Sequence, residues 1–254
     1  MCLILFAWRA HARYELVLAA NRDEFHDRPA APAAYWPEAP DVLAGRDLEA
    51  GGTWLGITRS RRFAALTNYR ESNRPAARAR HSRGLLVNDW LAGDDEPMPA
   101  ARGLADAGVD YSGFNLLLGR PGELVYLSNR RADPRPVAAG VHGLSNHLLD
   151  TDWPKVRAGR ERLAAALDGD AVDIERLFGL LGETQAVDGA LPDGLAACLA
   201  PENLARQLFI RSPVYGTRCS TVLLIGRNGG VVFEERRFDA SGQPAGAGRF
   251  EMPA

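Results

Sequence analysis

Cys2 directly follows the initiator methionine and is the residue best placed to act as a nucleophile. Removal of Met1 would leave Cys2 with a free α-amino group, whose ordinary pKa of about 8 lets it act as a base at neutral pH. A thiol becomes nucleophilic once it is deprotonated, so one residue could supply both nucleophile and base. Position alone favours a plainer interpretation, in which Cys2 is a small buried residue that opens a strand.

Four consecutive polar residues, Asn21 to Glu24, close the second apolar run of the chain. A hairpin would bring them back beside Cys2, where Arg22 would stabilise a thiolate and Asp23 would hold the α-amino group. Adjacent side chains on a strand point to opposite faces, so either Asn21 and Asp23 or Arg22 and Glu24 share a face. The alternative is a solvated strand end whose charges pair with each other.

Four pairs of strand-length apolar runs, most of them joined by short polar turns, are expected to position these residues. The pairs are CLILFAW with YELVLAANRD, TWLGIT with RFAALTN, FNLLLG with ELVYLSN, and STVLLIG with VVFEERRF. Helical patterns occupy residues 85–91, 100–107, 153–167 and 172–181. Antiparallel hairpins with segregated helices predict an α+β fold rather than a parallel nucleotide-binding sheet.

The length of 254 residues suits one domain, which is expected to span residues 1–254. Residues 36–46 are rich in proline and polar side chains and predict a loop. Residues 69–83 predict an exposed loop excursion over the fold. The glycine- and proline-rich segment after residue 239 predicts a frayed tail.

Composition and charge exclude several classes of function. A net charge of -2 gives no long-range field for gathering nucleic acid. The 30 basic residues include a single lysine, Lys155, and this arginine bias carries no phosphate-binding meaning. The three cysteines, Cys2, Cys198 and Cys219, form neither a disulfide framework nor a zinc site, and they favour a reducing compartment.

The short apolar start of the chain lacks the basic segment of a signal peptide, and no run has the length of a membrane span. We therefore expect a cytoplasmic protein with no integral membrane segment. Neither a GxSxG elbow nor a nucleotide-binding glycine motif follows any predicted strand. The sequence does not predict the oligomeric state.

Several long sequence blocks occur in one order along the chain. The initial Met-Cys and AANRDEF are followed by GGTWLGI, FAALTNYR, SRGLLV, GLSNHLLDTDWPKV and YGTRCSTV. Together they resemble the NRDE family, also called the transport and Golgi organisation protein 2 family. That family has been associated with haem trafficking and with lipid or acyl-CoA homeostasis, which implies a non-catalytic ligand carrier as one possible role.

A remoter resemblance, to choloylglycine-hydrolase-like N-terminal-nucleophile enzymes, implies a four-layer αββα sandwich of two antiparallel sheets and a mechanism of acyl transfer. By this resemblance Cys2 is the nucleophile and base. Asn146 would donate to the oxyanion, and Arg218 would complete the polar floor of the site. Asn68 would be a second donor or a substrate contact.

The chain departs from those enzymes at one point, because they separate the arginine from the aspartate whereas Arg22 and Asp23 are adjacent here. Both can face Cys2 only if the strand bulges or ends there. Asn21 and Glu24 are then expected to contact the substrate. Trp54, which follows a glycine-rich turn, is expected to line a pocket.

These residues lead to the expectation of an N-terminal cysteine hydrolase that cleaves an amide or thioester bond of an acyl substrate. It would need no metal and no cofactor. The alternative is a non-catalytic protein that binds and transports haem, an acyl-CoA or a lipid, although no CxxCH haem-attachment motif is present. In either case the partner is a small molecule.

Overall fold

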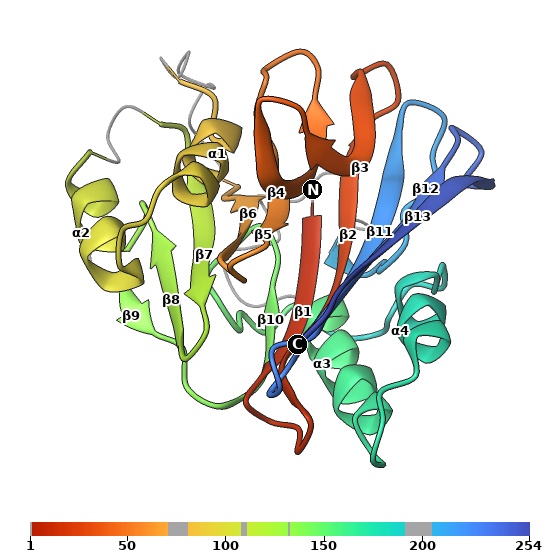
Figure 1. Ribbon diagram of the computed structural model, residues 1–254. Helices are drawn as coiled ribbons and strands as arrows, with labels where there is room; N and C mark the ends of the chain where they lie inside the picture. The colour runs from red at the N-terminus through yellow and green to blue at the C-terminus, as the bar shows by residue number, and fades with distance from the viewer. Residues whose placement is uncertain (1, 71–80, 108–110, 132, 191–204) are drawn as a thin grey trace. The chain divides into compact units, whose positions relative to one another are not determined.

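Two antiparallel sheets and four helices make up the described part of the computed structural model, which covers residues 2–70, 81–107, 111–131, 133–190 and 205–254 (Figure 1). Contacts divide the chain into two compact units. The first contains Met1–Asp27, Ala138–Ser145 and Leu149–Ala254, and the second contains Arg28–Val137 and Asn146–Leu148. The predicted α+β class is confirmed, and a single domain over residues 1–254 stays a prediction.

The first unit contains a six-stranded sheet in the order β10-β1-β2-β11-β12-β13. Its strands are β1 (Cys2–Trp8), β2 (Tyr14–Phe25), β10 (Gly140–Leu144), β11 (Tyr215–Gly226), β12 (Val231–Phe238) and β13 (Pro244–Met252). Its helices are α3 (Pro154–Ala166) and α4 (Ile174–Leu181).

Strand β1 is buried on both of its faces. Leu3, Leu5 and Ala7 belong to the core that α3 and α4 cover. Ile4 and Phe6 point to the opposite face of the sheet and are also fully buried. A strand with two buried faces has a continuous apolar sequence, which explains why the first residues of the chain show no polar alternation.

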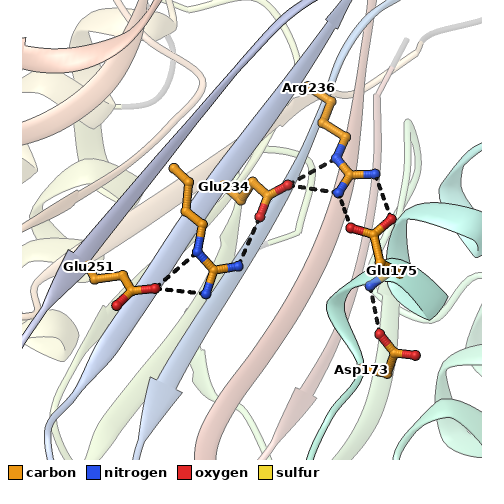
Figure 2. A network of polar contacts seen from close by, with 6 residues as sticks. Asp173, Glu175, Glu234, Arg236 and Glu251 are labelled. Atoms are coloured by element: carbon orange, nitrogen blue, oxygen red, sulfur yellow. Dashed lines mark hydrogen bonds and ion pairs between the residues drawn. The ribbon is translucent and has the colours of Figure 1, made fainter.

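Helix α4 is fastened to the sheet by a network of ion pairs at its first turn (Figure 2). Arg236 of β12 pairs with Glu175 of α4 and with Glu234 of its own strand. Glu234 is shared with Arg249 of β13, 3.2 Å away. Asp173 caps the helix by accepting a bond from the Glu175 backbone N–H. Because the pairs are linked, they hold the helix better than isolated surface pairs would.

The second unit contains a seven-stranded sheet in the order β3-β4-β5-β6-β7-β8-β9. Its strands are β3 (Ala30–Trp36), β4 (Ala39–Asp47), β5 (Leu55–Thr58), β6 (Phe63–Asn68), β7 (Phe114–Arg120), β8 (Glu123–Ser128) and β9 (Arg135–Pro136). Helices α1 (Gly84–Ala92) and α2 (Pro97–Ala107) pack on this sheet. The Trp90 indole of α1 donates to the Phe63 carbonyl of β6 at 2.9 Å, which fixes the helix on the sheet.

The four predicted strand pairs and the four predicted helices are confirmed, with ends that differ by a few residues. Of the predicted loop excursion at 69–83, residues 71–80 lie outside the described residues. In the described part of the chain, every helix is too short or too polar to cross a membrane.

The predicted loop at residues 36–46 is wrong, because most of it forms β4. Val42, Leu43 and Ala44 are buried and pair with β5. Pro37 lies in the turn before β4, and Pro40 lies beside a register irregularity between β3 and β4. Prolines are tolerated at such places because no ladder hydrogen bond is lost there.

The predicted frayed tail after residue 239 is also wrong, because residues 244–252 form β13 along β12. Phe250 packs edge-on against Phe233, with ring centroids 6.4 Å apart. Arg249 pairs with Glu234 across the two strands, and Met252 is buried. These cross-strand contacts outweigh the low strand propensity of the three glycines in the segment 242–248.

Substitution of Gly52 by alanine is expected to lower the free energy of unfolding by about 1–3 kcal/mol. A Cβ at this position would lie 2.5 Å from the Gly84 carbonyl carbon, and backbone atoms cannot move aside cheaply. The matched control is Gly103→Ala in α2, where a Cβ meets nothing within 4 Å. Urea unfolding should show the control equal to the parent or up to about 1 kcal/mol more stable. Equal effects of both substitutions would contradict the close approach at Gly52.

Candidate functional site

Cys2 opens β1 and lies directly opposite Arg22 of β2. On its other side, Arg22 lies opposite Cys219 of β11. Opposed residues of an antiparallel pair point to the same face, so the Arg22 side chain lies in a row between two thiols. Leu3 belongs to the core under the helices, so this row lies on the sheet face that points away from α3 and α4. The predicted placement of Arg22 beside Cys2 is what the structure shows.

Asp23 is held on the opposite face, the one that the helices cover. Its carboxylate is 2% exposed and accepts a hydrogen bond from the Thr217 hydroxyl at 2.7 Å. Thr217 itself accepts from the Ile210 backbone N–H at 2.9 Å. The Tyr215 hydroxyl donates to the Asp23 carbonyl oxygen at 2.8 Å. Asp23 is therefore positioned by the start of β11.

A register shift in β11, rather than in β2, accompanies this arrangement. Thr217 lies opposite Asp23 and Cys219 opposite Arg22, which leaves Arg218 as the extra residue of a bulge. The Arg218 guanidinium donates to the carbonyl oxygens of Phe25 and His26, at 2.8 and 3.2 Å. Arg218 thus binds the end of β2, and its role in a polar floor stays a prediction.

Arg22 and Asp23 can belong to one site at Cys2 although they lie on opposite faces of the sheet. The thiol of Cys2 projects to the face that carries Arg22. Its backbone nitrogen lies in the plane of the sheet, between the two faces, where a group on the helix side can approach it. Without a bulge in β2, Arg22 can therefore act on the thiol of Cys2 and Asp23 on its backbone nitrogen.

Burial raises the pKa of the Cys2 thiol above its usual range, and the nearby Asp23 charge raises it further. The positive charge at the amino terminus and the Arg22 guanidinium oppose that rise in pKa. A hydrogen bond from the Asp23 backbone N–H also favours the thiolate and lowers the pKa of Cys2. The partners that stabilise a thiolate are thus grouped around a thiol whose pKa burial raises.

Burial also raises the pKa of the Asp23 carboxyl group. The positive charges of the amino terminus and Lys155 hold the rise back, as does the hydrogen bond from Thr217. Arg22 acts in the same direction with a smaller effect on the pKa of Asp23. Asp23 is therefore a buried acid surrounded by positive charge.

Three further residues at this place were not assigned to the site from the sequence. The Ser145 hydroxyl donates to the Cys2 carbonyl oxygen at 2.8 Å and fixes the start of β1. Thr217 and Lys155 act on Asp23 from β11 and α3. All three are far from Cys2 and Asp23 in the sequence, and only the pairing of strands and the packing of a helix bring them together.

Asn21 lies on the helix face and has no exposed surface. Its amide nitrogen donates to the carbonyl oxygens of Leu181 and Leu208, at 2.9 Å each. Its amide oxygen accepts from the Ser220 hydroxyl at 2.6 Å. This placement contradicts the prediction that Asn21 binds substrate, because the amide ties the end of α4 to the sheet.

Glu24 and Trp54 are both half-buried. The Glu24 carboxylate accepts a hydrogen bond from the Phe25 backbone N–H at 2.9 Å. Trp54 lies just before β5, and its carbonyl oxygen accepts from the Leu66 N–H at 2.7 Å. Contact of these two residues with substrate stays a prediction.

Asn68 and Asn146 lie side by side in the second unit. Asn146 is 2% exposed, and its amide nitrogen donates to the Asn68 carbonyl oxygen at 2.8 Å. The Arg70 backbone N–H donates to the Asn146 carbonyl oxygen at 2.8 Å. The neighbouring His147 carbonyl accepts from Asn115 at 2.9 Å. The structure thus rigidly positions Asn146, as an oxyanion donor requires, and its action as that donor stays a prediction.

A family model described as transport and Golgi organisation 2 matches residues 1–240 of the chain. The chain belongs to the transport and Golgi organisation 2 family. It is 34% identical to the "Transport and Golgi organization 2 homolog" of Mus musculus, over 93% of this chain and 92% of that protein. It is 31% identical to the "Transport and Golgi organization protein 2" of Drosophila melanogaster, over 92% and 91% of the two chains. The resemblance found in the sequence blocks is confirmed.

The fold of this transport and Golgi organisation 2 family member is similar to that of a known hydrolase. A crystal structure of the C2A mutant of the conjugated bile acid hydrolase from Clostridium perfringens matches with a TM-score of 0.55. The match covers 99% of this chain and 92% of that chain, at 8% sequence identity. This likeness confirms the predicted N-terminal-nucleophile hydrolase fold, and at this identity it shows the fold alone.

The substitution Asn21→Ala is expected to lower the free energy of unfolding by about 3 kcal/mol, because it leaves two buried carbonyl groups and a hydroxyl without their partner. Glu24→Ala, three residues further along β2, is the matched control and should change it by less than about 0.5 kcal/mol. Urea unfolding measures both. If Asn21→Ala leaves the stability unchanged, the Asn21 amide is not needed for folding and could bind a ligand instead.

Proposed function

We propose that this chain is an N-terminal cysteine hydrolase that cleaves the amide or thioester bond of an acyl substrate. The observation that carries the proposal is the strand register, which sets Arg22 opposite Cys2 and puts the next residue, Asp23, on the other face of the sheet. The likeness of the fold to a conjugated bile acid hydrolase supports it.

The first step of the proposed function is the removal of Met1, which frees the α-amino group of Cys2. The neutral amine accepts the proton of the Cys2 thiol, directly or through a water molecule. Arg22 favours the thiolate because its positive charge lowers the pKa of the thiol. Asp23 accepts a hydrogen bond from the resulting ammonium group and holds it in place.

In the acylation step, the Cys2 sulfur forms a bond to the carbonyl carbon of the substrate, and the carbonyl oxygen becomes an oxyanion. Asn146 and a backbone N–H are the proposed donors to that oxygen, and one such donor lowers the barrier by about 3 kcal/mol. The bond to the amine or thiol leaving group then breaks, and the leaving group takes the proton held by the α-amino group. A thioester joins the acyl group to Cys2.

In the deacylation step, water attacks the carbonyl carbon of that thioester. The α-amino group accepts a proton from the water and returns it to the sulfur as the carbon–sulfur bond breaks. The acid product leaves, and the free thiol and amine are restored. One residue therefore acts as nucleophile and as base in both steps.

Substitution of Cys2 by alanine is expected to reduce the hydrolysis of acyl-amide and acyl-thioester substrates by at least about 10³-fold, because no covalent intermediate can form. The matched control is Cys219→Ala, which removes the second thiol of the same row and should change the rate by less than about tenfold. Intact-mass measurement should show the loss of Met1 and an acyl adduct on the parent protein.

Two results would count against this function. A chain that keeps Met1 in its native host has no free amine on Cys2. Haem or acyl-CoA binding that is equal in the parent and Cys2→Ala proteins, with no acyl substrate hydrolysed, would favour ligand transport instead.

Alkylation of Cys2 by iodoacetamide is expected to accelerate with rising pH into the alkaline range, because burial raises the pKa of this thiol. Arg22→Met should slow alkylation at pH 8 by about tenfold, since loss of the positive charge raises the pKa of the thiol by about one further unit. Arg9→Met, on an exposed arginine beyond the far end of β1, is the control and should leave the rate unchanged. Mass spectrometry of the Cys2 peptide follows the reaction. An alkylation rate that Arg22→Met leaves unchanged would show that the guanidinium does not influence the Cys2 thiol.

A further inference from the structure

Lys155 is the only lysine among the 30 basic residues of the chain, and its side chain has no exposed surface. Lysine is almost never fully buried unless a partner compensates its charge. Arginine supplies every other cationic side chain, including those of the surface ion pairs. A buried lysine in such a chain therefore requires a particular explanation.

The position of Lys155 in its helix adds to the cost of this charge. Lys155 is the second residue of α3, which begins at Pro154. The first turn of a helix carries partial positive charge, so a cation there is disfavoured. The next residue, Val156, lies against Gly143 of β10, which pairs with Leu5 of β1, so the start of α3 lies over β1 and β10 on the helix face of the sheet. A buried cation at this place needs an anion close by.

Asp23 is the candidate for that anion. Its carboxylate is buried on the same face of the sheet, and the charge of Lys155 lowers its pKa. On its own side of the sheet Asp23 also accepts the hydrogen bond from the Thr217 hydroxyl of β11. The charges of the amino terminus and of Arg22, which lies on the opposite face, also lower the pKa of Asp23, and the Asp23 charge raises the pKa of the Cys2 thiol. The Trp153 ring, 5.9 Å from the lysine nitrogen, adds a cation–π contact on the helix side.

We propose that Lys155 is a positioning residue for the hydrolase function proposed above: its buried ammonium group keeps Asp23 ionised, and ionised Asp23 holds the α-amino group of Cys2. The inference rests on that proposed function for its role in catalysis. The proposed Lys155–Asp23 pairing concerns the folded chain alone and can be tested without any substrate.

A single lysine makes the direct test unusually clean. Growth with lysine carrying ¹³C at Cε gives one side-chain NMR signal, whose pH titration reports the protonation of Lys155. Asp23→Asn should lower the titration midpoint of Lys155 by one pH unit or more relative to the parent, because the buried ammonium loses its anion. Asp152→Asn is the control: this exposed carboxylate lies three residues before Lys155 and pairs with Arg157. It should leave the midpoint in place.

The catalytic consequence is tested with Lys155→Met, which keeps the length of the side chain and removes the charge. The acidic limb of the pH–rate profile should move to higher pH by about one unit, because Asp23 then loses its proton only at higher pH. An equal loss of rate at every pH, with the acidic limb of the profile unmoved, would show that Lys155 has only a structural role. If Lys155→Met does not fold, the double variant Asp23→Asn/Lys155→Met, which removes both charges, should recover folded protein.

The outcomes separate the two proposals. An Asp23→Asn protein whose Lys155 titrates as in the parent overturns the pairing, whether or not the chain is a hydrolase. A shifted titration in a protein that hydrolyses no acyl substrate keeps the pairing and removes the proposed function.

Discussion

The antiparallel register of β1 on β2 is the constraint on which the rest of the candidate site depends. It sets Cys2 opposite Arg22, and the pleat of the strand then sends Asp23 to the other face. A slip of one residue would exchange these faces and move the whole apolar pattern of β1 with them. Because Leu3 and Leu5 are fully buried under the helices, that slip is strongly disfavoured. The hydrophobic core of the first unit thus fixes the geometry of its polar end.

That polar end places charged groups where the sheet is covered on its helix side. Asp23 and Lys155 are both buried there, and burial of ions costs free energy that their mutual attraction and hydrogen bonds must offset. Asn21, one pleat closer to the middle of the same strand, is neutral, and its hydrogen bonds are made within the protein. The ions are therefore concentrated at the end of β2 that pairs with the start of β1, and an uncharged amide separates them from the apolar core.

The sequence predicted more of the fold than of the site. Four strand pairs and four helices follow from apolar runs and helical spacing. Five strands lie outside those pairs, and β4 and β13 were assigned to a loop and a tail because their pairing depends on neighbours that are not visible in local patterns. Arg22 and Asp23 could be identified because a hairpin returns them to Cys2. Asn21 could not be assigned correctly, since its partners Leu181 and Leu208 are 160 and 187 residues away in the chain. Lys155 was visible as a single lysine, but only the packing of α3 reveals its burial.

The bulge at Arg218 reverses the alternation of β11, so that side chains after it point to the opposite face from the one expected in a regular strand. Before it, the odd-numbered Thr217 faces the helix side with Asp23; after it, the even-numbered Ser220 and Val222 face that side. Residues 217 and 219, which would share a face in a regular strand, therefore serve opposite sides of one sheet. A single inserted residue lets one strand deliver a hydroxyl to the buried acid and a thiol to the row of Arg22. The two sides of the site can consequently vary in sequence independently of each other, although they are built on the same backbone.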